Sequence, residues 1–213
     1  MIILGIESSC DETAVALVER GKKNRILDEE IKSQIPIHRE FGGVVPELAS
    51  RNHYEVIDQL TRRLLSRTNL REIGEISLIA YTRGPGLTGS LLVGQSFAKA
   101  LSYRHRIPLV GVDHIQGHIQ SAFIENHDLE YPLLALVVSG GHTSIYFKKS
   151  LQESTLLCKT RDDAIGEVLD KTAKYFDLGY PGGPILDGLY SRGQPDAFSF
   201  TPPRMSDGSE DFS

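Results

Sequence analysis

The chain has 213 residues and a formal net charge of -5, with 40% hydrophobic and 24% charged residues. This composition is typical of a globular protein with one large or two smaller domains, and it excludes a fibrous or disordered chain. The acidic balance also excludes a surface that grips nucleic acid by bulk positive charge, so any nucleic-acid contact must be local.

The N-terminus and the cysteines restrict the cellular setting. The apolar start Met1–Glu7 is too short for a signal peptide or a membrane span and has no basic segment before it, so we expect a cytoplasmic protein with no membrane partner. Cys10 and Cys158 lie far apart and outside any Cys-x-x-Cys spacing. We therefore expect two free thiols.

Hydrophobic periodicity predicts alternating strands and helices in the first half of the chain. An apolar run and a β-compatible run predict a hairpin whose polar turn is Ser9 to Glu12. The elements expected, in chain order, are strands near 2–8, 13–18 and 26–34, a helix at about 47–67, a strand at 76–82, a helix that carries Leu92, Val93, Phe97, Ala98 and Leu101 toward a core, a strand at 108–112, and a helix that begins at Asp113 or His114 with Asp113 as its N-cap.

The second half starts again with strands. The elements expected there are strands at 133–139, 143–148 and 153–159, helices at 163–177 and 184–192, and a loop at 194–213. Because this order repeats the opening of the chain, we expect a duplicated α/β architecture of mixed sheets flanked by helices, with domains at 1–131 and 132–213. Each copy would offer one hairpin turn to a shared cleft.

His114 and His118 form the first candidate site. Two histidines at i and i+4 project from the same face of a helix, roughly 6 Å apart, which suits two imidazoles that bind one divalent ion. A third ligand at helical spacing is absent from the sequence nearby. Two polar residues on a solvated helix face remain the alternative. A His-Glu-x-x-His zinc peptidase is excluded because Ile115 stands where that motif needs its glutamate.

The segment Val137–Thr143 is the second candidate site. Its pair Gly140-Gly141 follows a buried strand, so backbone N–H groups can approach an oxygen-rich ligand without interference from a Cβ, and the hydroxyls of Ser139 and Thr143 add donors. Phosphate binding is the functional interpretation. A simple β-turn is the alternative.

Two further segments carry polar groups suited to a nucleoside. On the expected helix at 163–177, Ile165, Val168 and Phe176 should be buried while Asp170 lies on the opposite face, where it can accept hydrogen bonds from ribose hydroxyls or an amine. Gly166 weakens that helix and predicts a close neighbour of its backbone.

The turn Gly179–Pro184, with Asp187 one helical turn further on, offers bare backbone for adenine or ribose. For the helix at 163–177 the alternative is a charged, solvated outer face. For Gly179–Pro184 it is a simple turn between two helices. Arginines also cluster on the helix at 47–67 and just beyond it (Arg62, Arg63, Arg67 and Arg71) and at Arg104 to Arg106. These are candidate RNA contacts or solvated faces.

Seven segments together resemble the TsaD family of transfer RNA threonylcarbamoyltransferases, once described as sialoglycoprotein endopeptidases, in its bacterial form. They are Gly5–Thr13, Phe41–Glu47, Gly84–Leu87, His114–His118, Ser139–Thr143, Asp170–Lys174 and Tyr180–Pro184. Each segment alone is weak evidence for this family, but all seven in the right order are specific to it.

The resemblance implies an actin-like fold of two related domains, the second one incomplete. It also implies one divalent metal ion, Fe²⁺ or Zn²⁺, bound by His114 and His118. The implied activity is transfer of the threonylcarbamoyl group from threonylcarbamoyl-AMP to N6 of an adenosine in transfer RNA. Asp11 and Glu12 match an acidic pair important for activity. The positions that match the adenylate-binding residues are Val137, Val138, Ser139, Gly140, Gly141, Asp170, Gly183 and Asp187.

The resemblance further implies partners and a longer chain. Family members work with a TsaB-like paralogous dimerisation subunit and a small TsaE-like ATPase. They continue past residue 213, where the aspartate that completes the metal site lies, so exposed apolar surface and weak metal binding are expected of these 213 residues. The alternatives are an actin-like small-molecule kinase or ATPase, which needs Mg²⁺ bound by carboxylates rather than paired histidines, and a non-catalytic dimerisation paralogue, which would lack His114 and His118.

Overall fold

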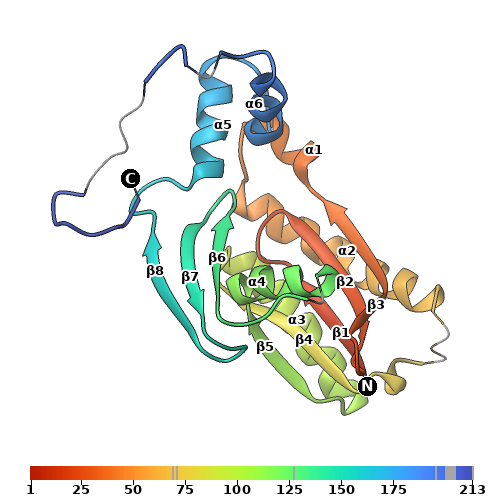
Figure 1. The fold of residues 1–213 in the computed structure, drawn as a ribbon. Helices are drawn as coiled ribbons and strands as arrows, with labels where there is room; N and C mark the ends of the chain where they lie inside the picture. The colour runs from red at the N-terminus through yellow and green to blue at the C-terminus, as the bar shows by residue number, and fades with distance from the viewer. Residues whose placement is uncertain (69, 71, 127, 195, 200–204, 213) are drawn as a thin grey trace. The chain divides into compact units, whose positions relative to one another are not determined.

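A computed structural model describes residues 1–68, 70, 72–126, 128–194, 196–199 and 205–212. They form two compact units, Met1–Glu125 and Asn126–Ser213, both drawn in Figure 1. The sequence predicts the boundary after Tyr131, and the structure divides the chain after Glu125. Among the described residues, no helix is both long and apolar enough to cross a membrane.

A five-stranded mixed sheet in the order β3-β2-β1-β4-β5 forms the base of the first unit. Its strands are β1 (Ile2–Glu7), β2 (Glu12–Glu19), β3 (Arg25–Ser33), β4 (Leu78–Gly84) and β5 (Leu109–Asp113). The first three pair antiparallel, which confirms the predicted hairpin, while β4 and β5 continue the sheet in parallel with β1. Because parallel strands end at the same edge, the residues that follow β1, β4 and β5 meet there.

Two long helices, α2 (Pro46–Ser66) and α3 (Thr88–His105), pack on one face of this sheet (Figure 1). Alternate residues of the strands point to that face, which is why Leu4 and Ile6 are buried together. The fully or nearly fully buried apolar core is Leu4, Ile6, Val15, Leu17, Ile57, Leu60, Leu64, Ile76, Ile79, Ala98 and Ile107.

The helix that follows β5 is α4 (His114–Glu125). Asp113 Oδ1 accepts the backbone N–H of Gln116 at 3.0 Å, so the predicted N-cap is confirmed. Three short elements escaped prediction because they are too short to show periodicity: α1 (Ile35–His38), η1 (Arg39–Phe41) and η2 (Ile73–Glu75).

One residue of α3 departs from the sequence prediction. Val93, Phe97 and Leu101 pack against the core as expected, but Leu92 is 53% exposed. The prediction for Leu92 was wrong because an α-helix turns about 100° per residue, and Leu92 lies on the solvent side of the stripe that Val93, Phe97 and Leu101 form.

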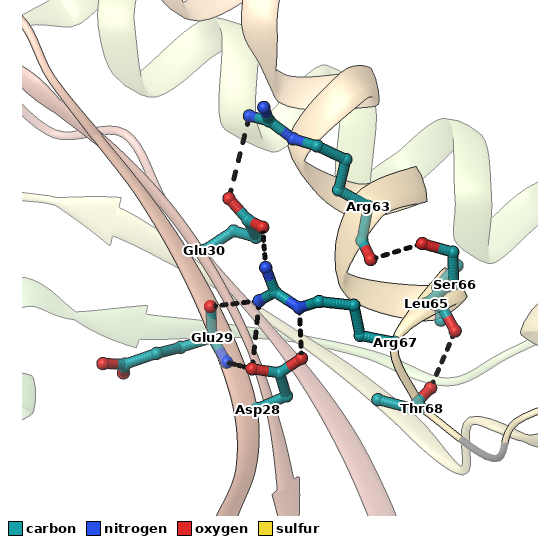
Figure 2. A network of polar contacts seen from close by, with 8 residues as sticks. All are labelled: Asp28, Glu29, Glu30, Arg63, Leu65, Ser66, Arg67 and Thr68. Atoms are coloured by element: carbon teal, nitrogen blue, oxygen red, sulfur yellow. Dashed lines mark hydrogen bonds and ion pairs between the residues drawn. The ribbon is translucent and has the colours of Figure 1, made fainter.

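The arginines at the end of α2 are held by acidic residues of β3, as Figure 2 shows. Arg67 donates to both carboxylate oxygens of Asp28, at 2.8 and 3.0 Å, and also contacts Glu30. Arg63 lies 3.7 Å from Glu30, and Arg62 pairs with Asp58. These ion pairs favour the interpretation of a solvated face over an RNA contact for this cluster. Arg71 lies outside the described residues.

The second unit contains a three-stranded antiparallel sheet and two helices. These are β6 (Leu133–Val138), β7 (Thr143–Lys148), β8 (Ser154–Lys159), α5 (Ile165–Tyr175) and α6 (Gly182–Tyr190). The antiparallel order β6-β7-β8 repeats that of the first three strands, as the duplication predicts. Beyond α6, the described residues form no helix or strand, and an isolated bridge joins Phe212 to Thr160.

Apolar side chains of the second unit stay exposed, which corrects one prediction and confirms another. Ile165, Val168 and Phe176 are 45%, 46% and 63% exposed, so the predicted burial of this face of α5 was wrong. Three strands and two helices offer too little surface to cover it. Leu134, Leu136 and Val138 of β6 are also exposed, as expected for these 213 residues.

The core of the first unit yields a matched test of stability. Leu60 is fully buried on α2, so Leu60→Ala should lower the free energy of unfolding by about 2–5 kcal/mol through lost burial and a residual cavity. Leu92→Ala, which removes the same atoms from the solvent side of α3, should change it by less than about 0.5 kcal/mol. Urea unfolding of both variants measures the difference. Equal losses would contradict the assignment of the two faces.

Candidate functional site

The turn after β1 packs closely against α3 and against the loop that follows β4. Ser8 Oγ donates to the carbonyl of Ser90 at 2.8 Å. A Cβ on Gly94 would lie 2.3 Å from Ser8 Oγ, and a Cβ on Gly86 would lie 2.6 Å from the carbonyl oxygen of Ser9. Glycine at these two positions therefore lets α3 and the loop after β4 approach the turn.

His114 and His118 converge as the sequence predicts. Their rings are 4.4 Å apart between centroids, and the two Nε2 atoms are 3.1 Å apart. Two nitrogens bound to one ion at about 2.0–2.1 Å with a tetrahedral angle are separated by roughly 3.3 Å. The pair therefore fits two adjacent ligands of a single divalent ion. Among the described residues, no cluster of three or more His, Cys, Asp or Glu side chains is placed to hold a metal.

Glu7 occupies the other side of the His114 ring. Its Oε2 lies 3.3 Å from His114 Nδ1, and the carboxylate also accepts hydrogen bonds from Thr82 Oγ1 and from the backbone N–H of Ser9. Burial alone would raise the pKa of Glu7, but the hydrogen bonds from His114, Ser9 and Thr82 outweigh it and lower the pKa to about 2. Glu7 is therefore a fixed negative charge beside the histidine pair.

The turn that carries Asp11 and Glu12 is anchored by a buried histidine of α2. His53 is fully buried, its Nε2 lies 2.9 Å from the carbonyl oxygen of Cys10, and its Nδ1 lies 2.7 Å from Thr13 Oγ1. The carbonyl can only accept, so Nε2 carries the proton and Nδ1 accepts from Thr13. Asp11 is partly exposed and Glu12 exposed, so both side chains can meet a ligand.

Cys10 and Cys158 are free thiols, as predicted. Burial and the charges of Asp11 and Glu7 raise the pKa of the Cys10 thiol to about 12. The thiol stays protonated near neutral pH, which makes Cys10 a poor nucleophile.

The glycine turn of the second unit is a closed hairpin turn seated on α5. The backbone N–H of Ser139 donates to the carbonyl of His142 at 2.8 Å, and the N–H of Gly166 donates to the carbonyl of Ser139 at 3.2 Å. Thr143 is buried, and its hydroxyl accepts the N–H of Ile165 at 2.8 Å. The hydroxyl of Thr143 thus supports the turn, and Ser139 Oγ accepts from the N–H of His142.

Gly140 and Gly141 differ from Gly86 and Gly94, which pack closely against the turn after β1. A Cβ on Gly140 or Gly141 would meet nothing within 4 Å, and neither has a left-handed φ. Packing and backbone conformation therefore do not require glycine here, whereas a ligand that rests on the backbone would. Val137 just before them is buried and Val138 is half exposed.

Asp170 joins α5 to α6. Its Oδ1 accepts the backbone N–H of Gly182 at 2.6 Å, at the N-terminus of α6 where a carboxylate is favourable. A Cβ on Gly182 would lie 2.3 Å from the carbonyl oxygen of Leu169, so this glycine serves packing. Gly183 is partly buried and Asp187 is exposed on α6.

Comparison with known proteins decides the family. A family model described as "TsaD: tRNA N6-adenosine threonylcarbamoyltransferase" matches residues 25–213. The chain belongs to the TsaD family. A relative of that name from Caldicellulosiruptor bescii is 53% identical over 200 residues, which cover 94% of this chain and 59% of that protein. One from Clostridioides difficile is 48% identical over 213 residues, which cover all of this chain and 62% of that protein.

The solved structures support the fold alone. YeaZ from Pseudomonas aeruginosa matches with a TM-score of 0.50 at 18% identity, over 73% of this chain and 63% of that one. The ethanolamine utilization protein EutJ from Carboxydothermus hydrogenoformans matches with a TM-score of 0.52 at 12% identity, over 90% of this chain and 63% of that one. The predicted actin-like α/β fold is thereby confirmed, and the chain spans about three fifths of the length of the TsaD relatives it matches.

Sequence reasoning missed Glu7, Thr82 and His53 as parts of this candidate site. Glu7 did carry a signal, since a carboxylate at the end of an apolar strand is costly unless it has partners. His53 carried a weaker one, because it stands on the apolar side of a helix between Ala49 and Ile57.

Gly166 yields a test of how the turn is seated in this TsaD chain. A Cβ on Gly166 would lie 2.6 Å from the carbonyl oxygen of Ser139 and 2.7 Å from the Cα of Gly140. Gly166→Ala should therefore destabilise the chain by about 1–3 kcal/mol and increase amide hydrogen exchange at residues 139–142.

Gly188→Ala on α6 is the matched control for Gly166→Ala. A Cβ at Gly188 would meet nothing within 4 Å, so alanine should stabilise the helix by up to about 1 kcal/mol. Thermal unfolding distinguishes the two. A neutral or stabilising Gly166→Ala would contradict the close contact.

His53 yields a test of pH dependence. Burial lowers the pKa of His53, and His38 lowers it further. The hydrogen bond to the Cys10 carbonyl and the charges of Glu7 and Asp11 raise this pKa, but the lowering effects prevail. The unfolded chain takes up a proton below about pH 6.5 and the folded chain resists it. Stability is therefore fully present above that pH and falls as the pH decreases, with His53 contributing at most about 1.4 kcal/mol per pH unit.

Urea unfolding between pH 7.5 and 5 checks this prediction for His53. The loss of stability should be smaller in His53→Gln than in the unsubstituted chain. His105→Gln, at the exposed end of α3, should leave the pH dependence unchanged. Equal slopes for all three chains would contradict the role of His53.

Proposed function

We propose that this chain carries the catalytic groups of a tRNA N6-adenosine threonylcarbamoyltransferase. Membership of the TsaD family over residues 25–213 is the observation that carries the proposal. The chain spans 59–62% of the length of the relatives of that name, so their activity is transferred to it by inference. The substrates proposed are threonylcarbamoyl-AMP and an adenosine in transfer RNA, acted on in the cytoplasm.

His114 and His118 are proposed to hold the divalent ion, Fe²⁺ or Zn²⁺. The 3.1 Å separation of their Nε2 atoms supports this role. A further ligand is expected from the part of the family sequence that lies beyond residue 213. When bound, the ion supplies Lewis-acid polarisation of the carbamoyl carbonyl.

Asp11 and Glu12 are proposed to act on the attacking amine. Both stand on the turn that His53 anchors through the Cys10 carbonyl, a few residues after Glu7. A carboxylate there can orient the adenosine N6 amine and accept its proton as the C–N bond forms. AMP leaves with the electron pair of the broken C–O bond, and no covalent enzyme intermediate is needed.

The turn at Val137, Val138, Ser139, Gly140 and Gly141 is proposed to bind the adenylate. The open space beside both glycines supports an approach of phosphate or nucleoside oxygens to bare backbone N–H groups. Asp170, Gly183 and Asp187 are proposed to contact the nucleoside. Asp170 already accepts one N–H through Oδ1, and its second oxygen remains for a hydroxyl.

Two protein partners complete the proposal. By resemblance to the family, these are a TsaB-like dimerisation subunit and a small TsaE-like ATPase. A basic segment at Arg104 to Arg106, at the exposed end of α3, stays a candidate for a local contact with transfer RNA.

The proposal is tested by product formation. In a chain of full family length, supplied with both partners, threonylcarbamoyl-AMP and transfer RNA, mass spectrometry of the digested RNA should find the modified nucleoside. His114→Ala and His118→Ala should each lower the rate by about 100-fold or more, because the loss of a metal ligand removes several kcal/mol of charge stabilisation. Leu92→Ala, a change on the solvent side of α3, should stay within about twofold. Unmodified RNA with metal bound would refute the proposal.

A further inference from the structure

Glu7 and His118 contact opposite nitrogens of the His114 ring. Glu7 Oε2 lies 3.3 Å from Nδ1, while His118 Nε2 lies 3.1 Å from Nε2. An ion held by the two Nε2 atoms is therefore on the far side of the imidazole from the carboxylate. Glu7 cannot be a ligand of that ion, and its contact is with the ligand instead.

The Glu7 carboxylate is fixed by the sheet rather than by the histidine. It ends β1, accepts the N–H of Ser9 through Oε1, and accepts the hydroxyl of Thr82 from the neighbouring strand β4 through Oε2. Because β1 and β4 pair in parallel with Ile6 opposite Tyr81, Glu7 and Thr82 lie side by side. The acceptor for His114 is thus in place before any metal binds.

A carboxylate can only accept, so the ring nitrogen that faces it must carry a proton. A neutral imidazole with Nδ1 protonated has its lone pair on Nε2, which is the nitrogen that faces His118. Carboxylates placed behind a ligating histidine fix its tautomer and orientation and raise its basicity.

We propose that Glu7 is a positioning residue that holds His114 as the Nδ1–H tautomer and so prepares the His114–His118 pair to bind a divalent ion. This inference rests on the metal site of the proposed function. It assigns Glu7 a role through His114 and no contact with substrate.

Ser9 offers a competing arrangement that the test must separate. Ser9 Oγ also lies 3.3 Å from His114 Nδ1. If the hydroxyl donated to Nδ1, the proton of the ring would sit on Nε2 and point at His118, which would block that nitrogen as a ligand. The Glu7 proposal requires the opposite assignment.

The tautomer is measured first, in the unsubstituted 213-residue chain without metal. Long-range ¹H–¹⁵N correlation spectra distinguish a protonated from an unprotonated imidazole nitrogen, and His114→Ala assigns the signal. The proposal predicts a protonated Nδ1 and an unprotonated Nε2 for His114. The reverse pattern overturns it, and this measurement needs no substitution at Glu7.

Zinc affinity is measured next, by competition with a chromophoric chelator. Glu7→Gln keeps the shape but can turn an amide N–H toward Nδ1, so the affinity should fall by about tenfold or more and the His114 tautomer should become mixed. Ser9→Ala should leave both unchanged. Glu55→Gln, the same change on an exposed position of α2, controls for the loss of charge alone.

The outcomes separate this inference from the proposed function. If His114→Ala abolishes zinc binding but Glu7→Gln does not weaken it, the role of Glu7 is refuted and the metal site stands. If His114→Ala leaves zinc binding unchanged, the metal site itself is refuted. Loss of affinity in Ser9→Ala but not in Glu7→Gln assigns the positioning role to Ser9.

Discussion

The parallel pairing of β1 with β4 is the constraint on which the site of the first unit depends. The register places Ile6 opposite Tyr81, so the next residues, Glu7 and Thr82, emerge together at the edge where the parallel strands end. β5 ends at that edge too and passes directly into α4, which brings His114 to Glu7. A slip of one residue would turn Glu7 toward the apolar face and leave His114 without its acceptor.

Glycine serves two different purposes around the candidate site residues. Gly94, Gly166 and Gly182 are needed by the fold itself, because a Cβ at any of them would overlap a neighbouring atom of the chain. Gly140 and Gly141 face open space. The sequence alone cannot separate these cases, since each appears in it only as a glycine. The structure separates them by what lies beside each backbone.

The sequence was sufficient for the longer helices and strands and for the spacing of the histidine pair, because both depend on local periodicity. It was insufficient for the buried polar network, in which Gln34 and His38, at the two ends of α1, meet His53 of α2 only in the fold. Burial on α5 was also mispredicted. Periodicity shows that Ile165 and Val168 share a face with Leu169, but it says nothing of whether another element covers that face.

The two units prepare their candidate ligand groups by different means. In the first, a closed apolar core between the sheet and the helices α2 and α3 fixes the strands that end in Glu7 and lead into α4. In the second, the glycine turn is held mainly by single hydrogen bonds from Ile165 and Gly166 to Thr143 and Ser139, beside apolar faces that remain exposed. Hydrogen bonds of this kind contribute about 1 kcal/mol each, far less than a core. The turn should therefore open more readily than the histidine pair, which suits the adenylate-binding role proposed for the turn.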